Sequence, residues 1–160
     1  MLLFGMPQRP KMILVSGGGE ADDRTTAVAA AVGTAIANSG ATLLTGGLGG
    51  VMEAASRGAK GAGGLTVAVI PGSDSQAANR YVDIVIASGM THGRNVILVH
   101  TADAVIALPG SYGTLSEIAL ALVMGKPVVS LDSWRPDDKV MLATDPQNAV
   151  TLALDALGRP

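Results

Sequence analysis

The fold of this chain is constrained most by a short apolar run that ends in a glycine-rich turn and is followed by a helical pattern. Residues 104–108 are all apolar, Pro109 and Gly110 interrupt the run, and apolar side chains recur from Leu115 onward at spacings of three and four. An unbroken apolar run is typical of a buried strand, whereas those spacings are typical of an amphipathic helix. The segment is therefore predicted to form a strand, a turn and the start of a helix.

Two further runs that are apolar nearly throughout, at residues 12–15 and 41–44, also end in glycines before a helical pattern. Their glycines are Gly17, Gly18 and Gly19 after the first run and Gly46, Gly47, Gly49 and Gly50 after the second. Nearly continuous apolar strands that alternate with helices are typical of a parallel sheet covered on both faces. The prediction is an α/β fold, in which residues 11–160 form a single Rossmann-like, doubly wound domain with a mostly parallel sheet. Residues 1–10 are expected to be a flexible N-terminal tail.

Local signals set the expected bounds of several elements. Asp22 and Asp23 are suited to a helix start, and Ser39 with Gly40 supplies a left-handed cap after a helix that runs to about Asn38. Further strands are expected at residues 65–70, 82–86 and 127–131, a helix is expected to open within residues 88–94, and a last helix is expected near residues 148–157.

The three glycine-rich turns are candidate phosphate sites. The backbone N–H groups of a helix's first turn lack partners within the helix, and the positive end of the helix dipole lies at the same place. Anions, and phosphate above all, bind there. In open α/β sheets the ligand lies beyond the carboxyl ends of the strands. All three turns and Arg94 are expected at that edge, so a small phosphorylated ligand is predicted.

Composition excludes several classes of partner. Hydrophobic residues make up 48% of the chain, charged residues 15%, and the net charge is −2. Because phosphate backbones are held by clustered Lys and Arg, no nucleic-acid partner is expected. The chain has no cysteine, and its two histidines, His92 and His100, stand apart from other ligands in a metal-binding spacing, so no structural metal is expected.

No apolar run approaches ~20 residues, so no membrane partner is expected and the protein is predicted to be cytoplasmic. Alanine-rich helices with few charges leave apolar stripes that a lone domain seldom exposes. A homo-oligomer, either a dimer or a tetramer, is therefore predicted.

Three segments resemble motifs of the cytokinin-activating phosphoribohydrolases, the Lonely Guy proteins of the superfamily once labelled "possible lysine decarboxylase". The motif Pro-Gly-Gly-x-Gly-Thr-x-x-Glu is matched at residues 109–117, Gly-Gly-x-x-Gly-Leu-Met at residues 46–52, and Met-x-x-Arg-Lys at residues 90–95 with one extra residue. The closer resemblance is to the molybdenum cofactor carrier branch and covers almost all of residues 11–131. The runs that carry it are residues 50–55, 81–84, 94–99 and 113–121.

The resemblance implies a phosphate-anchored binding protein, a carrier or store of molybdenum cofactor (molybdopterin). The alternative is a hydrolase that cleaves the N-glycosidic bond of nucleoside 5′-monophosphates, with Arg94 and Glu117 catalytic only in that case. A third reading is a nucleotide-binding module of unrelated purpose. Two departures from the hydrolase motifs are Ser111 in place of a glycine and Asn95 in place of a lysine. The candidate residues for binding the cofactor or nucleotide are Gly17, Gly18, Gly46, Gly47, Gly49, Gly50, Met90, Arg94, Pro109, Gly110, Ser111, Tyr112, Gly113, Thr114 and Glu117.

Two of these residues have a structural alternative. Thr114 and Glu117 have the spacing of a capping box, in which Glu117 only accepts a backbone N–H at a helix start. Arg94 stands at an expected helix start, where the dipole disfavours a cation, so it either grips a phosphate or pairs with a carboxylate such as Asp83.

The irregular stretch offers further open alternatives. Asp74 is expected to make a local turn, and Asn79 either makes a turn or binds the polar edge of a ring. Tyr112 either stacks on a ring or lies on the surface.

Overall fold

The computed structural model of the chain describes residues 8–158, so residues 1–7, most of the expected tail, and residues 159–160 lie outside the described part. The strands are β1 (Met12–Ser16), β2 (Thr42–Thr45), β3 (Thr66–Ile70), β4 (Ile84–Ala87), β5 (Ala104–Ala107), β6 (Val128–Ser130) and β7 (Met141–Leu142). They form one sheet in the order β4-β3-β2-β1-β5-β6-β7, and all neighbouring pairs are parallel.

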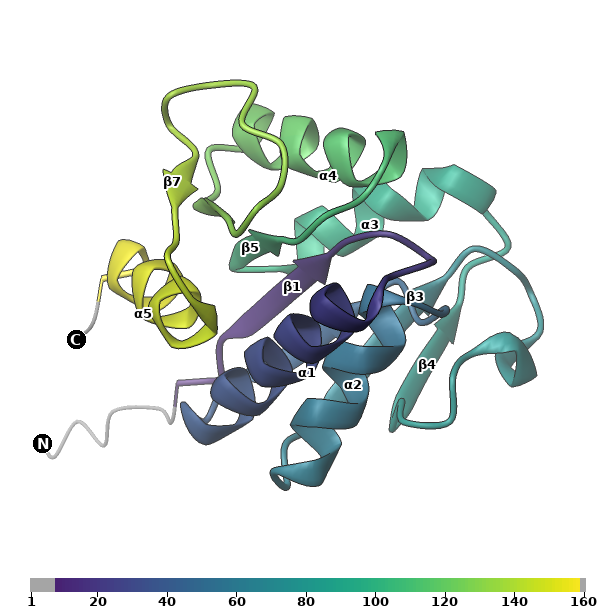
Figure 1. Ribbon diagram of the computed structural model, residues 1–160. Coiled ribbons are helices and arrows are strands. Elements are labelled where there is room, and N and C mark those ends of the chain that lie inside the picture. Colours follow the sequence, from purple (N-terminus) through teal and green to yellow (C-terminus); the bar gives the residue numbers. More distant parts are fainter. Residues whose placement is uncertain (1–7, 159–160) are drawn as a thin grey trace, which may run out of the picture.

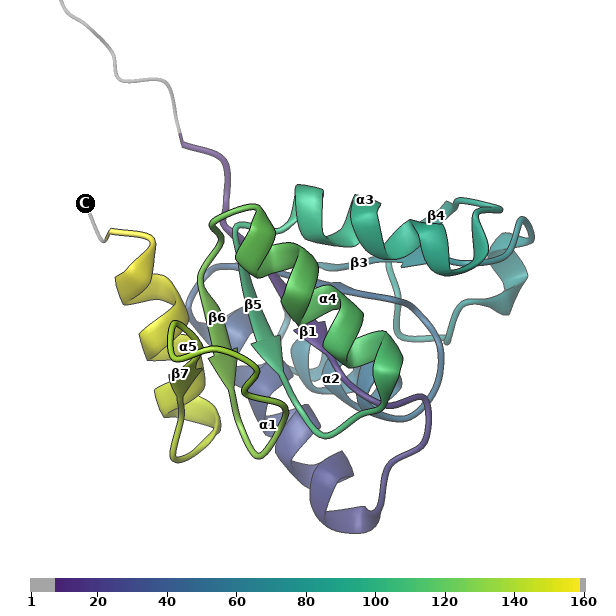
Figure 2. The same cartoon turned by 90° about the horizontal axis from the view of Figure 1, so that it is seen from above.

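Helices cover both faces of this sheet. Helices α1 (Asp23–Asn38), α2 (Val51–Gly61) and α5 (Pro146–Ala156) lie on one face, and α3 (Arg94–Thr101) and α4 (Tyr112–Val123) lie on the other (Figures 1 and 2). Two apolar cores result, one on each side of the sheet. The predicted α/β, Rossmann-like, doubly wound fold is confirmed.

The central strand β1 supplies side chains to both cores. Ile13 and Val15 pack toward α1, α2 and α5, whereas Leu14 packs toward α3 and α4. β1 pairs with β2 on one side and with β5 on the other. The strand order therefore reverses at β1 and β5, and in such sheets the crevice beyond that reversal is where ligands bind.

The first helix has the predicted ends. The Asp22 side chain accepts the Thr25 N–H at 2.7 Å, and Gly40 after the helix has a φ of 80°. An aspartate in the N-cap position satisfies one of the N–H groups that the helix leaves unpaired. The left-handed conformation at Gly40 is the one that glycine adopts without steric cost.

The starts of other elements agree less uniformly with the prediction. The strand expected from residue 82 begins at Ile84, because the Asp83 backbone and carboxylate are both hydrogen-bonded to Thr66. The helix expected to open within residues 88–94 does begin there, at Arg94, after the 3-10 turn η2 (Thr91–Gly93). The last helix starts two residues before position 148, because Asp145 caps it by accepting the Asn148 N–H at 2.8 Å.

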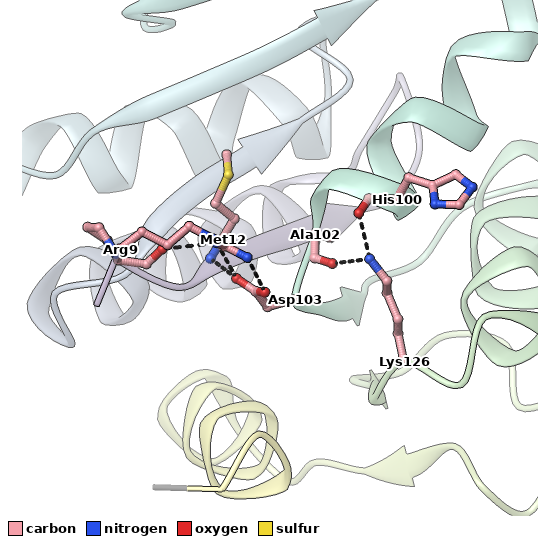
Figure 3. A network of polar contacts seen from close by, with 7 residues as sticks. Arg9, Met12, His100, Ala102, Asp103 and Lys126 are labelled. Carbon is pink, nitrogen blue, oxygen red and sulfur yellow. Dashed lines mark hydrogen bonds and ion pairs between the residues drawn. The ribbon is translucent and has the colours of Figure 1, made fainter. Parts of the chain in front are cut away.

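A polar network lies at the amino ends of the strands, on the side of the sheet opposite the glycine-rich turns (Figure 3). Asp103 accepts the Met12 N–H at 2.8 Å and pairs with both terminal nitrogens of Arg9, at 2.8 and 2.9 Å. Lys126 donates to the carbonyl oxygens of His100 and Ala102 at the end of α3. A cation satisfies the unpaired carbonyls at a helix C-terminus, so these side chains join β1, α3 and the start of β5.

Among residues 8–158, no helix is long and apolar enough to cross a membrane. In the same part of the chain, no group of three or more His, Cys, Asp or Glu side chains could hold a metal ion.

Candidate ligand-binding site

The three glycine-rich turns meet at the carboxyl edge of the sheet. The turn after β1 is bonded to the turn after β5, because Leu108 donates to the Ser16 carbonyl at 2.8 Å and Gly18 donates to the Pro109 carbonyl at 2.9 Å. It is also bonded to the start of α2, where Val51 donates to the Gly18 carbonyl at 3.0 Å. These backbone bonds hold the turns as one rigid surface at the point where strand order reverses.

A cavity of about 210 Å³ opens between these turns and helices α3 and α4. Its lining combines bare backbone with a few polar side chains. It consists of Val15, Ser16, Gly17, Gly18, Gly19, Gly46, Leu48, Met52, His92, Arg94, Asn95, Ser111, Gly113, Thr114 and Glu117.

Arg94 provides a cation to the cavity from the first residue of α3. Its guanidinium passes over Gly46, where a Cβ atom would lie 2.7 Å from Nη2, so a larger residue there would displace the guanidinium from this position. One terminal nitrogen donates to Asn95 Oδ1, whereas the buried Nε has no hydrogen-bond partner among the described residues. A buried unsatisfied donor costs about 1–3 kcal/mol, so the fold holds this side chain in place at a cost in stability.

Burial lowers the pKa of Arg94, and the charge of Glu117 raises it. The proposed alternative partner Asp83 instead pairs with Lys60. The guanidinium is thus directed to the cavity, and its nearby anionic group is Glu117.

Asn95 connects Arg94 to the start of α4. It is 5% exposed, and its Nδ2 donates to Ser116 Oγ at 3.0 Å, while that hydroxyl donates to the Gly113 carbonyl at 2.7 Å. The guanidinium is therefore held in register with the first turn of α4. The lysine that the hydrolase motif has at this position is replaced here by an amide that orients its neighbour.

Glu117 lies in the wall of the cavity and is 6% exposed. Its Oε2 accepts a hydrogen bond from the Ser16 hydroxyl at the end of β1. Burial raises the pKa of this carboxyl to about 6, although the Ser16 bond and the charge of Arg94 act in the opposite direction. The capping-box alternative is wrong, because α4 begins at Tyr112 and Glu117 lies beyond its first turn.

The N-terminus of α4 completes the site. Ser111 stands at the N-cap, but its side chain makes no capping hydrogen bond. Thr114 is buried and lines the cavity together with Gly113. Because the first N–H groups of a helix lack partners within it, this end of α4 and Arg94 offer donors to one anion.

The structure brings together part of the predicted set. The predicted residues in the cavity lining are Gly17, Gly18, Gly46, Arg94, Ser111, Gly113, Thr114 and Glu117. The others lie outside that lining, and they are Gly47, Gly49, Gly50, Met90, Pro109, Gly110 and Tyr112. The lining also contains residues that the predicted set lacked, namely Val15, Ser16, Gly19, Leu48, Met52, His92 and Asn95. Ser16 could have been noticed as the polar residue that ends an apolar run.

The residues of the irregular stretch build the loops around the site. Asn79 donates from Nδ2 to the carbonyls of Gly47 and Leu48, at 3.2 and 3.0 Å, and so fixes the loop before α2. Asp74 accepts the Gln76 N–H at 2.9 Å and makes the expected local turn. The sequence left open whether Asn79 makes a turn or binds a ring; in the structure its side chain holds the loop before α2.

Comparison with known proteins bears on the same residues. A model of the SLOG cluster4 family matches residues 10–156. The chain is similar to the structure of a molybdenum cofactor binding protein from the phototrophic bacterium Rippkaea orientalis, with a TM-score of 0.89, 38% identity, and coverage of 94% of this chain and 99% of that one. For the molybdenum cofactor carrier protein of Chlamydomonas reinhardtii the TM-score is 0.84 and the identity 34%, over 93% of this chain and 98% of that one.

A cytokinin riboside 5′-monophosphate phosphoribohydrolase of Mycobacterium tuberculosis is 39% identical over 117 residues. The match spans 67% of this chain and 62% of that enzyme, so a substantial part of the enzyme has no counterpart in it. The family resemblance inferred from the motifs is confirmed.

Proposed function

The chain belongs to the SLOG cluster4 family, and we propose that it is a cytoplasmic carrier that holds molybdenum cofactor, or a related phosphorylated pterin, by its phosphate. The observation that carries this proposal is that Arg94 lines the same cavity as Ser111, Gly113 and Thr114 at the N-terminus of α4. A guanidinium and a helix N-terminus together provide the charge and the N–H donors that a phosphate group requires.

The donor set suits the organic part of such a cargo. The chain has no cysteine, so none of its own thiolates is available to molybdenum, and the phosphate and the ring system would provide the grip. Similarity to the Rippkaea and Chlamydomonas proteins over more than nine tenths of the chain supports the same cargo.

The second candidate is hydrolysis of a nucleoside 5′-monophosphate, and Glu117 is the observation that favours it. A buried carboxylate close to a bound ribose would stabilise the positive charge that develops on the sugar as the base departs. Glu117 shares the cavity with Arg94, and the Mycobacterium tuberculosis relative catalyses a reaction of this kind by name.

Two substitutions separate the candidates. Arg94→Ala should weaken binding of a phosphorylated ligand by about 1.5–3 kcal/mol, roughly tenfold to a hundredfold, because it removes a charge-assisted contact. Glu117→Gln should leave the affinity of a carrier nearly unchanged, since the amide retains the size of the carboxyl. Calorimetric titration with ribose 5-phosphate and with GMP measures both effects, and Arg57→Ala, on the exposed face of α2, is the matched control.

A measurement of base release from nucleoside 5′-monophosphates decides between the carrier and the hydrolase. A carrier should release no base, and the small molecule that co-purifies with it should be a pterin. If instead base release is clear and Glu117→Gln abolishes it while nucleotide still binds, the carrier is ruled out, because a group needed mainly in the transition state affects turnover more than affinity.

A further inference from the structure

An exposed pair of aromatic side chains lies at the glycine-rich turn after β5 (residues 109–114, the phosphate turn), and neither function proposed above uses it. Tyr112 and Trp134 stack with ring centroids 6.3 Å apart and planes inclined by 29°. Tyr112 is 80% exposed and Trp134 is 38% exposed. The chain has only one Trp, two Tyr and one Phe, so half of its aromatic residues gather at this one place.

The pair is attached to the phosphate turn itself. Tyr112 is the first residue of α4, and the indole N–H of Trp134 donates to the Gly110 carbonyl at 3.0 Å. Trp134 comes from the connection between β6 and β7, so the bond holds this loop against the turn. The tethered indole and the exposed tyrosine thus present ring faces to solvent beside the turn.

The cavity at Arg94 is too small for a whole pterin or nucleotide. Its volume is about 210 Å³, whereas sites for ligands of that size occupy roughly 300–1,000 Å³. It can hold a phosphate with its adjoining carbon atoms, and the ring system must therefore lie outside it.

Three hollows adjoin one another between the cavity and Trp134 of the aromatic pair. An outer hollow of about 550 Å³ shares Gly18, Gly19 and Ser111 with the cavity. A third hollow of about 250 Å³ includes Trp134 and shares Pro109 and Gly110 with the outer one. The phosphate turn is thus the wall that all three spaces have in common.

We infer that Tyr112 and Trp134 form a stacking subsite for the planar nitrogen heterocycle, a pterin or a purine, of a ligand whose phosphate lies at Arg94 and the start of α4. This rests on the proposed phosphate anchoring. Every such ring offers a π-face, and an exposed aromatic platform binds it with little regard to its edge. The ring then lies across the phosphate turn from Glu117.

The single tryptophan makes the inference directly measurable. All indole fluorescence comes from Trp134, so a ring that stacks on the pair should quench it. GMP should quench the emission, whereas ribose 5-phosphate, which has the phosphate and no ring, should bind by calorimetry without quenching. An unchanged emission spectrum at saturating GMP would overturn the stacking subsite.

Variants at Tyr112 test how much the stacking contributes to the affinity for GMP. Tyr112→Ala should weaken GMP about tenfold, in the range that loss of one stacked ring produces, and should leave the affinity for ribose 5-phosphate at its wild-type value. Tyr112→Phe keeps the ring and should restore GMP binding. Equal GMP affinity in all three proteins would contradict the subsite.

The two proposals can fail separately. If ribose 5-phosphate binds normally but GMP neither quenches nor gains affinity over it, the subsite falls and phosphate anchoring stands. If guanosine quenches while ribose 5-phosphate does not bind, the subsite stands and phosphate anchoring falls.

Discussion

The Glu117 carboxyl shows how far one residue's role depends on a distant contact. Local spacing allowed it to be a helix cap, but its partner is the hydroxyl of Ser16, 101 positions earlier in the chain. No local pattern contains that information, and the same holds for Asn95, whose amide bonds to Ser116. Arg94 was predictable because a cation at a helix start is unfavourable and requires a reason.

Burial of Glu117 should give the protein a distinctive pH dependence. Its folded-state pKa of about 6 lies above the ordinary 4.5. The unfolded chain therefore loses this proton first as the pH rises, and the folded state loses stability between the two values. The shift corresponds to about 2 kcal/mol.

Glu117→Gln cannot titrate, so it isolates this contribution. Relative to that variant, the wild type should lose about 2 kcal/mol of unfolding free energy between about pH 4 and about pH 7. Urea denaturation of both proteins at the two pH values measures the difference. A constant difference, or a wild type that gains stability relative to the variant, would contradict the raised pKa.

At the scale of elements, α1 and α2 cross unusually closely. A Cβ atom at Gly33 of α1 would collide with the Ala55 carbonyl, and one at Gly58 of α2 would collide with the Ala30 carbonyl. The Thr34 hydroxyl donates to the Gly58 carbonyl at 3.2 Å across the same contact. The two helices thus touch backbone to backbone on one face of the sheet, beside the turns that line the site.

Gly33→Ala should therefore destabilise the protein despite the better helix propensity of alanine. We expect a loss of about 1–3 kcal/mol or more, since two backbones would have to separate. Gly58→Ala should behave alike. Gly61→Ala is the matched control, because a Cβ atom there meets nothing within 4 Å, and its thermal midpoint should stay equal to the wild type or rise. A neutral Gly33→Ala would refute the close crossing.

The spacing of apolar residues alone predicted most of the strands and helices, because buried strands and amphipathic helices each require their own spacing. The predicted first and last residues of an element were less accurate where a side chain of another element determines them. Thr66, which is hydrogen-bonded to Asp83 just before β4, is an example. Which strands become neighbours was not predictable, since the patterns of β2 and β5 fit equally well beside β1. The grouping of the three turns into one site was not predictable for the same reason, because the strand order brings the turns together.

At the scale of the whole molecule, one face of the sheet continues beyond its helices. Ile84 and Ile86 of the edge strand β4 pair with Val67 and Val69, which belong to the core under α3. They therefore face the same side, yet they are 49% and 44% exposed. Val96 on α3 is also exposed. Neighbouring apolar side chains of this kind are typical of subunit contacts.

The predicted homo-oligomer should therefore use the β4 edge. Light scattering at micromolar concentration should give a mass of at least two chains, against 16.0 kDa for one, and Ile86→Asp should shift it to the mass of one chain. Leu142→Asp changes an exposed leucine on β7 at the other edge and should leave the mass unaltered. A wild type with the mass of one chain would refute the assembly.

The central place of β1 also determines when a binding site exists during folding. Its two neighbours come from opposite halves of the chain, and the bond between Ser16 and Glu117 closes a loop of about a hundred residues. Contacts between such distant positions are slow to form, because the entropy of closing the loop must be overcome first. A ligand thus meets its complete site only after the sheet has assembled. It acts on the finished protein by slowing unfolding, and it takes no part in the early search for the fold.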